Sequence, residues 1–327
     1  MENFLIPLAF AYQKIAQFKN FLYDLNILKT KEIRAPVISV GNLSFGGTGK
    51  TPVTISLAEK FIDMGYRVAI LLRGYKGKFE KRGAMVSDGK NILYNWKEAS
   101  DEAFLIAKNV RKAGVFVGKN RVINALNAME LGFNLIILDD GFQYRPLYRN
   151  IDIVIISSEN RKLLREPFSS LKRANILLFY NTIDEKISKK IRKFNLYISK
   201  FHYLKLGFYD VNENNFYLVD YFKGKKAIAF CGIANPSRFK RFLEELEVDI
   251  KHFSSFPDHY SYPQNSINTL LKKHRELKTD VLLTTEKDAL KLKAYSNLPI
   301  YYLKIKACLS DDLISYILKG LKTYASD

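Results

Sequence analysis

The chain has 327 residues, which leaves room for about two domains, and 47% of them are hydrophobic, which excludes an extensively disordered protein. Its 52 Lys and Arg residues outnumber its 33 Asp and Glu residues, and the net charge of +19 indicates an anionic partner: nucleic acid, a membrane surface or a phosphorylated substrate. Two cysteines and four scattered histidines exclude a disulfide framework or a Cys-rich zinc site and favour a reducing cytoplasm.

The first predicted element is an amphipathic helix at residues 4–28. Its apolar run is shorter than the about 20 residues that a transmembrane helix needs, and residues 1–3 lack the basic start of a signal peptide. Such a helix can lie in a membrane interface, or it can pack on its own domain as most amphipathic helices do. The apolar stripe consists of Phe4, Leu8, Ala11, Ile15, Phe18, Leu22 and Leu25.

A glycine-rich loop follows a short strand at residues 37–40 and precedes an amphipathic helix at 51–63, which is the context of a P-loop. In such a loop the backbone N–H groups and the helix N-terminus bind phosphate, the lysine reaches the β- and γ-phosphates, and the next hydroxyl binds Mg²⁺. The standard pattern places Gly where Ser44 stands here. The predicted nucleotide-binding residues are Ser44, Phe45, Gly46, Gly47, Thr48, Gly49, Lys50 and Thr51.

A second apolar run, at residues 135–138, ends in Asp139 and Asp140. A buried strand that delivers Asp at its carboxyl end is the Walker B arrangement, in which the acid binds Mg²⁺ directly or through water. Ligands of open α/β sheets gather at the carboxyl ends of the strands, so both carboxylates are expected near Lys50. Thr51, Asp139 and Asp140 are therefore the predicted metal ligands, and which carboxylate touches the metal stays open.

Alternating apolar runs and helical patterns predict an α/β fold: a doubly wound, mostly parallel, P-loop NTPase-like sheet with helices on both faces, followed by a second, smaller α/β domain. The polar stretch at 210–215 is the expected connector, which gives an N-terminal segment 1–30, a P-loop domain 31–209 and a smaller domain 210–327. In the first domain the further strands are predicted at 67–72, 151–156 and 175–179, and the helices at 98–110 and 120–130. In the second, strands are predicted at 224–231, 280–284 and 299–303, and helices at 237–246, from 286, and at 311–324.

Two polar segments of the second domain allow two interpretations each. His259, within residues 256–260, is either a core or surface histidine or a catalytic base brought across a cleft. Residues 284–288 contain a Thr-Glu-Lys-Asp sequence that either caps the following helix or faces a substrate.

Together these motifs resemble the tetraacyldisaccharide 4'-kinase family of lipid A biosynthesis. The resemblance runs in order from about residue 1 to about residue 290, and the serine at position 44 is a trait of that family. The N-terminal helix also matches, which identifies residues 1–30 as a membrane-interface segment. The shared pieces are residues 39–44, 46–51, 72–75, 101–102, 138–143, 164–167, 256–260 and 285–288.

The resemblance implies transfer of the γ-phosphate of ATP, with Mg²⁺, to the 4'-hydroxyl of a tetraacyldisaccharide 1-phosphate, a lipid A precursor. It further implies a monotopic enzyme on the cytoplasmic face of the inner membrane of a Gram-negative bacterium, with the smaller domain closing over the site. Lys50 and Asp101 become catalytic, the latter as the base on the sugar hydroxyl, with His259 as its partner from the other domain. The implied secondary site residues are Arg73, Glu102, Arg121, Arg165 and Glu166.

The chain departs from the family pattern at two places. Tyr144 stands where the family usually has His, and the loop at 161–167 lacks the family's small-residue segment, so the loop before Arg165 is shorter. Two other function classes share some of these features. A GTPase or ATP-dependent ligase shares the P-loop, but the guanine-specific Asn-Lys-x-Asp sequence is absent; a nucleic-acid-binding protein would explain the charge, but no such motif accompanies the basic residues, so no nucleic-acid partner is predicted.

Overall fold

The computed structural model describes residues 2–156, 164–182, 185–212, 215–295 and 297–322. These form two compact units: unit 1 comprises residues 1–202 with 307–327, and unit 2 comprises residues 203–306. Two strands, β8 (Tyr197–Asp210) and β13 (Ile300–Leu309), carry the chain from one unit into the other. The sequence predicts a boundary at 209/210 and the terminal helix in the smaller domain; here the division falls at 202/203, and the terminal helix is counted with unit 1.

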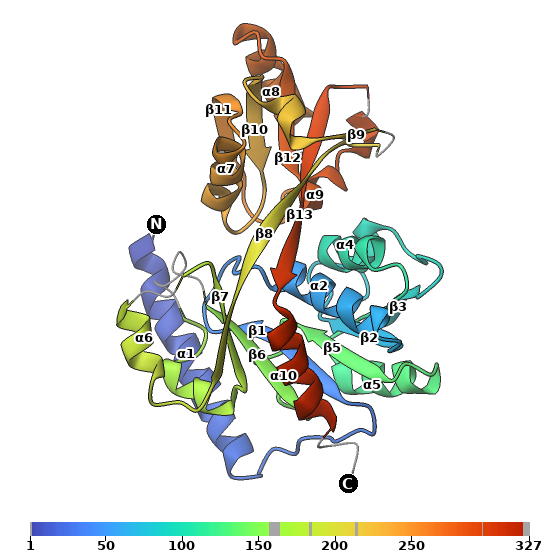
Figure 1. Ribbon diagram of the computed structural model, residues 1–327, viewed down its shortest axis with the longest axis vertical. Helices are drawn as coiled ribbons and strands as arrows, with labels where there is room; N and C mark the ends of the chain where they lie inside the picture. The colour runs from blue at the N-terminus through green and yellow to red at the C-terminus, as the bar shows by residue number, and fades with distance from the viewer. Residues whose placement is uncertain (1, 157–163, 183–184, 213–214, 296, 323–327) are drawn as a thin grey trace. The chain divides into compact units, whose positions relative to one another are not determined.

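Unit 1 is built on a mostly parallel sheet, as the alternating apolar runs predict (Figure 1). Its strands lie in the order β8-β7-β6-β1-β5-β2-β4-β3; within this order β3 pairs antiparallel with β4, and the other described neighbours pair in parallel. The inner strands are buried along their whole length, which is why they appear in the sequence as continuous apolar runs. Besides β8, the strands of unit 1 are β1 (Val37–Asn42), β2 (Val68–Leu72), β3 (Ala84–Asp88), β4 (Gly114–Val117), β5 (Leu135–Asp139), β6 (Ile151–Ile156) and β7 (Ile176–Tyr180).

Five predicted helical ranges correspond to helices of unit 1, whereas the helices at 168–173 and 185–191 are not predicted from the sequence. The helix expected at 98–110 is two helices that meet at Ser100, which has φ 94° and serves as C-cap of the first and N-cap of the second. The predicted helix at 311–324 is described to Lys322; residues 323 and 324 lie outside the described residues. The helices are α1 (Glu2–Asp24), α2 (Lys50–Asp63), α3 (Trp96–Ala99), α4 (Asp101–Asn109), α5 (Arg121–Glu130), η1 (Phe168–Arg173), α6 (Glu185–Ile191) and α10 (Asp311–Lys322).

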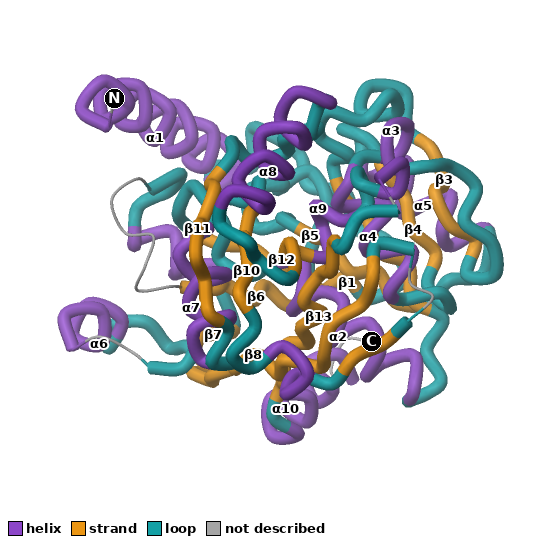
Figure 2. Tube along the Cα trace, turned by 90° about the horizontal axis from the view of Figure 1, so that it is seen from above, coloured by secondary structure: helices purple, strands orange, loops and turns teal. Residues whose placement is uncertain are grey.

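Unit 2 is a smaller α/β unit in which parallel strands lie in the order β11-β10-β12-β13. Helix α7 packs against β11 and α8 against β10 (Figure 2). The sequence does not predict β11, because this edge strand is polar and nowhere fully buried. It also does not predict β3, β4 and β8. The elements are β9 (Phe216–Tyr217), η2 (Val219–Phe222), β10 (Lys226–Cys231), α7 (Pro236–Glu245), β11 (Asp249–Ser255), α8 (Gln264–Glu276), β12 (Val281–Thr285), α9 (Glu286–Ala289) and η3 (Lys293–Tyr295).

Candidate active site

The glycine-rich loop connects β1 to the first residue of α2, Lys50. Gly46 and Gly49 have φ of 99° and 96°, a left-handed conformation that glycine adopts without strain, and Gly49 is the N-cap of α2. The Asn42 side-chain amide donates to the Thr48 hydroxyl at 3.0 Å and braces the loop from its strand. The loop therefore ends at a helix N-terminus, where backbone N–H groups and the helix dipole favour a bound phosphate.

Asp139 lies at the carboxyl end of β5, directly beside β1 in the sheet. It accepts hydrogen bonds from the hydroxyls of Thr51, at 3.0 Å, and Thr54, at 2.9 Å. Burial, reinforced by the negative charges of Glu102 and Asp140, raises the pKa of Asp139 to about 6. The sequence reading did not select Thr54, although its position three residues after Thr51 places both hydroxyls on one face of the helix.

Asp140 has the opposite electrostatic environment. It has φ 54°, and its carboxylate lies 3.6 Å from the Lys50 ammonium and 2.8 and 3.0 Å from one guanidinium nitrogen of Arg165. Burial works to raise the pKa of Asp140, but Lys50 and Arg165 lower it below its usual range. Of the two neighbouring carboxylates, Asp139 is thus bound by hydroxyls and Asp140 by cations.

Arg121, the first residue of α5, brings a further positive charge to this region. Its side chain is 8% exposed, and its guanidinium carbon lies 4.6 Å from the ring centre of Tyr144. The Tyr144 hydroxyl accepts the Arg121 backbone N–H at 2.9 Å. Burial lowers the pKa of Arg121, and the charge of Asp140 opposes that effect. Tyr144, the departure from the family pattern, therefore holds Arg121 through both its ring and its hydroxyl.

Asp101 and Glu102 begin α4, and Asp101 is buried. The charge of Glu102 contributes to the raised pKa of Asp139, which places α4 in the electrostatic environment of that carboxylate. Arg73, whose charge acts on Arg121, is more exposed and pairs with Glu80 at 2.7 Å. Glu80 was not among the predicted residues.

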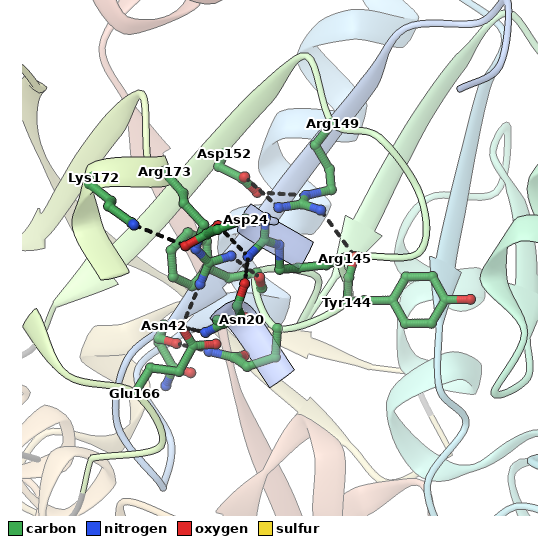
Figure 3. Close-up of polar contacts among 12 residues, drawn as sticks. Asn20, Asp24, Asn42, Tyr144, Arg145, Arg149, Asp152, Glu166, Lys172 and Arg173 are labelled. Carbon is green, nitrogen blue, oxygen red and sulfur yellow. Dashed lines mark hydrogen bonds and ion pairs between the residues drawn. The ribbon is translucent and has the colours of Figure 1, made fainter. Parts of the chain in front are cut away.

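Arg165 and Glu166 are adjacent in sequence but reach different places. The Arg165 N–H donates to the Leu43 carbonyl at 2.7 Å, which aligns its segment with the start of the glycine-rich loop. The fully buried Glu166 instead pairs with Arg173 and accepts a hydrogen bond from Asn20 of α1 at 3.0 Å (Figure 3). Residues 161–163, the predicted shortened part of this loop, lie outside the described residues.

The second half of α1 is tied to unit 1 by ion pairs and leaves its apolar side open. Asp24 lies 2.9 Å from both Arg145 and Lys172 (Figure 3). Ile15 and Phe18 are 69% and 63% exposed, and Phe21 and Leu25 are also exposed. The side chains of Phe4, Leu8 and Ala11 lie outside the described residues. In the described part of the chain no helix is long and apolar enough to cross a membrane.

His259 belongs to unit 2, whereas Asp101 belongs to unit 1. His259 follows β11 on a loop and has φ 64°. Its backbone N–H donates to the Gly232 carbonyl at 3.2 Å and to the Asp258 carboxylate at 3.0 Å. The structure thus describes each partner of the predicted Asp101–His259 pair within its own unit, and the pair itself stays a prediction.

The residues around Asp139 suit Mg²⁺. Hard oxygen donors are the ligands that this ion prefers, and a protein usually supplies one or two carboxylates while substrate phosphates and water supply the rest. Here the Thr51 hydroxyl and the buried Asp139 carboxylate are the two oxygen donors that the protein would supply. Across the residues described, no group of three or more His, Cys, Asp or Glu could hold a metal ion by itself.

A strand, a glycine-rich loop, a helix starting at Lys50 and a buried Asp on the neighbouring parallel strand define a P-loop nucleotide-binding protein. The model of the tetraacyldisaccharide-1-P 4'-kinase family matches residues 1–322. The chain belongs to this family, as its motifs predict.

Individual relatives agree with this assignment. The tetraacyldisaccharide 4'-kinase of Aquifex aeolicus is 35% identical over 322 residues, which are 94% of this chain and 95% of the relative. The enzyme of Syntrophus aciditrophicus is 33% identical over 314 residues, which are 89% of this chain and 83% of the relative. A crystal structure of LpxK from Aquifex aeolicus in complex with ATP superimposes with a TM-score of 0.73 and 32% identity, covering 98% of both chains.

Proposed function

We propose that this chain transfers the γ-phosphate of ATP to the 4'-hydroxyl of a tetraacyldisaccharide 1-phosphate, a lipid A precursor, at the cytoplasmic face of the inner membrane. Family membership supports the reaction. The observation that carries the proposal is that Lys50 and Thr51, at the end of the glycine-rich loop, contact Asp140 and Asp139 respectively.

The nucleotide half of the site supplies positive charge. Loop amides and Lys50 bind the phosphates, while Arg165 and Arg121 supply further cations near Asp140. Phosphoryl transfer depends mainly on positioning and on neutralising the charge of the equatorial oxygens. Arg165 is then shared between Asp140 and the nucleotide, so that Asp140 holds the cation in place before ATP arrives.

The metal half of the site is assigned to Thr51 and Asp139. We place Mg²⁺ with Asp139 rather than Asp140, because only Asp139 shares a contact with the Thr51 hydroxyl. A Mg²⁺ ion held by Thr51 and Asp139 would supply positive charge that neutralises the phosphate oxygens. The raised pKa of Asp139 indicates a carboxylate that lacks a sufficient positive neighbour, which a cation would provide.

The acceptor half of the site is assigned to Asp101, with His259 as its partner from unit 2. A base must lie within about 2.6–3.2 Å of the hydroxyl proton that it takes. In this proposal the proton passes from the sugar hydroxyl to the Asp101 carboxylate, and His259 tunes the proton affinity of that carboxylate.

A kinase assay tests the reaction. Radiolabelled γ-phosphate from ATP should appear on a tetraacyldisaccharide 1-phosphate in detergent with Mg²⁺, and Lys50→Ala should abolish transfer. Asp101→Asn and His259→Gln should each lower kcat by about 10²-fold or more. Label found only in free phosphate would contradict the kinase assignment, whereas full turnover by either variant would remove the proposed base pair alone.

Membrane association is assigned to α1. Its exposed Ile15 and Phe18 can enter an interface, and each nearby Lys or Arg gains about 1 kcal/mol from an anionic surface. In a flotation assay with phosphatidylglycerol-containing vesicles, the parent protein should float with the vesicles and the Ile15→Ser/Phe18→Ser variant should not. The matched control Ile123→Ser/Leu126→Ser changes two exposed apolar residues of α5 and should float like the parent. Equal flotation of both variants would overturn this role of α1.

A further inference from the structure

The Thr-Glu-Lys-Asp sequence at residues 285–288 lies where β12 passes into α9. Thr285 is the N-cap of α9: its hydroxyl accepts the Asp288 N–H at 3.2 Å and donates to the Asp288 carboxylate at 2.6 Å. Of the two interpretations of this segment, the structure therefore shows that Thr285 caps the following helix. It leaves Asp288 itself to be explained, because this carboxylate is 0% exposed, and burying a carboxylate is costly unless it has partners.

Asp288 has further partners: the buried Lys291 ammonium, which lies 3.9 Å from the carboxylate, and a backbone amide on another element. Its carboxylate accepts the N–H of Gly232, the residue after β10, at 3.0 Å. The carbonyl of Gly232 in turn accepts the His259 N–H at 3.2 Å. A single residue thus connects the buried carboxylate to the backbone of His259.

The loop that bears His259 packs tightly against Gly232. A Cβ atom added at Gly232 would lie 3.0 Å from the Tyr260 Cβ, 3.1 Å from the Pro257 carbonyl oxygen and 3.2 Å from an Asp288 carboxylate oxygen. His259 has a left-handed φ of 64°, a conformation that non-glycine residues keep only where their surroundings impose it. The contacts at Gly232 are such surroundings.

The other side of the loop is fixed as well. The Phe256 and Tyr260 rings stack with centres 4.6 Å apart, and the Tyr260 hydroxyl lies 2.7 Å from the Ser266 hydroxyl of α8. Lys287, the neighbour of Asp288, lies 3.2 Å from Asp258, whose carboxylate accepts the His259 N–H. Residues 287 and 288 therefore reach the loop by two separate routes.

We propose that Asp288 is a positioning residue that fixes His259 through the Gly232 peptide. The proposal rests on the role assigned above to His259. An acceptor at this point holds the Gly232 N–H and, through the same residue, the carbonyl that accepts the His259 N–H. An apolar side chain here would leave that buried N–H without this acceptor. Burial raises the pKa of Asp288, and the bonds from Thr285 and Gly232 oppose that rise.

Two variants of the full chain test the proposal. Asp288→Ala removes the acceptor of the Gly232 N–H, and Gly232→Ala keeps the carboxylate but displaces the loop. Each should lower kcat about 10- to 100-fold, because small displacements of a reacting group have effects of this size, and leave the KM for ATP within about twofold. In each, the His259 imidazole NMR signal, assigned with His259→Gln, should shift or broaden while that of His202 in unit 1 stays.

The matched control is Asp280→Ala. Asp280 also accepts a backbone N–H of β10, that of Lys226 at 2.8 Å, but at the start of the strand. This variant should keep the parent kcat and His259 signal. An unchanged His259 signal in folded Asp288→Ala and Gly232→Ala would overturn the proposal, even if thermal stability fell. Should Asp288→Ala fail to fold, Gly232→Ala decides by the same readouts. Full turnover of His259→Gln would instead contradict the catalytic role of His259. The His259 NMR signal of the other variants would still show whether Asp288 and Gly232 fix the position of His259.

Discussion

Asp140 and Arg165 act as one unit at the residue scale, since one guanidinium nitrogen lies within 3.0 Å of both carboxylate oxygens. We predict that Arg165→Ala lowers kcat/KM by about 10²-fold, the usual size for loss of one charge-stabilising group. Asp140→Asn should give a loss that is not additive with it, because residues in direct contact couple. A double-mutant cycle on kcat/KM measures this; strict additivity would contradict the shared role, and exposed Arg34→Lys serves as control.

Cys231 carries a second residue-scale prediction. Burial, together with the charge of Asp288, raises the pKa of this thiol to about 12. Only the thiolate reacts with alkylating agents, so a raised pKa means that about one thiol in 10⁴ is reactive at pH 8. Iodoacetamide at pH 8 should therefore leave Cys231 unmodified in the native protein and modify it in guanidinium chloride, as read by peptide mass spectrometry. Rapid native labelling would contradict the buried environment.

At the scale of elements, the local motifs were predictable and the long-range partners were not. The glycine-rich loop and the strand ending in Asp139 are recognisable because each carries its chemistry within a few consecutive residues. The division at Ser100 was not, since a capping residue inside a helical pattern gives no sign that the backbone takes a positive φ there. Glu166 looked like a neighbour of Arg165 in function, but its partner Asn20 is 146 residues away.

The Glu166–Arg173 pair fixes two elements, because Asn20 of α1 and Arg173 of η1 meet at one buried carboxylate. Removing one partner of a buried ion pair leaves an uncompensated charge, which costs about 3–5 kcal/mol. We predict that Glu166→Ala lowers the free energy of unfolding by about this amount in urea titration. The control Glu185→Ala breaks an exposed pair with Lys189 and should cost less than about 1 kcal/mol. Equal losses would show that burial is not the deciding factor.

At the scale of the whole molecule, each unit has its own buried core, but the predicted nucleotide site belongs to unit 1 alone. A ligand stabilises what it binds by about 2.7 kcal/mol at 100 times its Kd. ATP with Mg²⁺ should therefore slow hydrogen exchange at the backbone amides of residues 44–51 and of β5, and leave the core amides of β10 unchanged. Lys50→Ala should lose this protection. Equal slowing in β10 would show that the two cores open as a single cooperative unit, in which case nucleotide bound beside Lys50 would also stabilise the Gly232 peptide and the loop that carries His259.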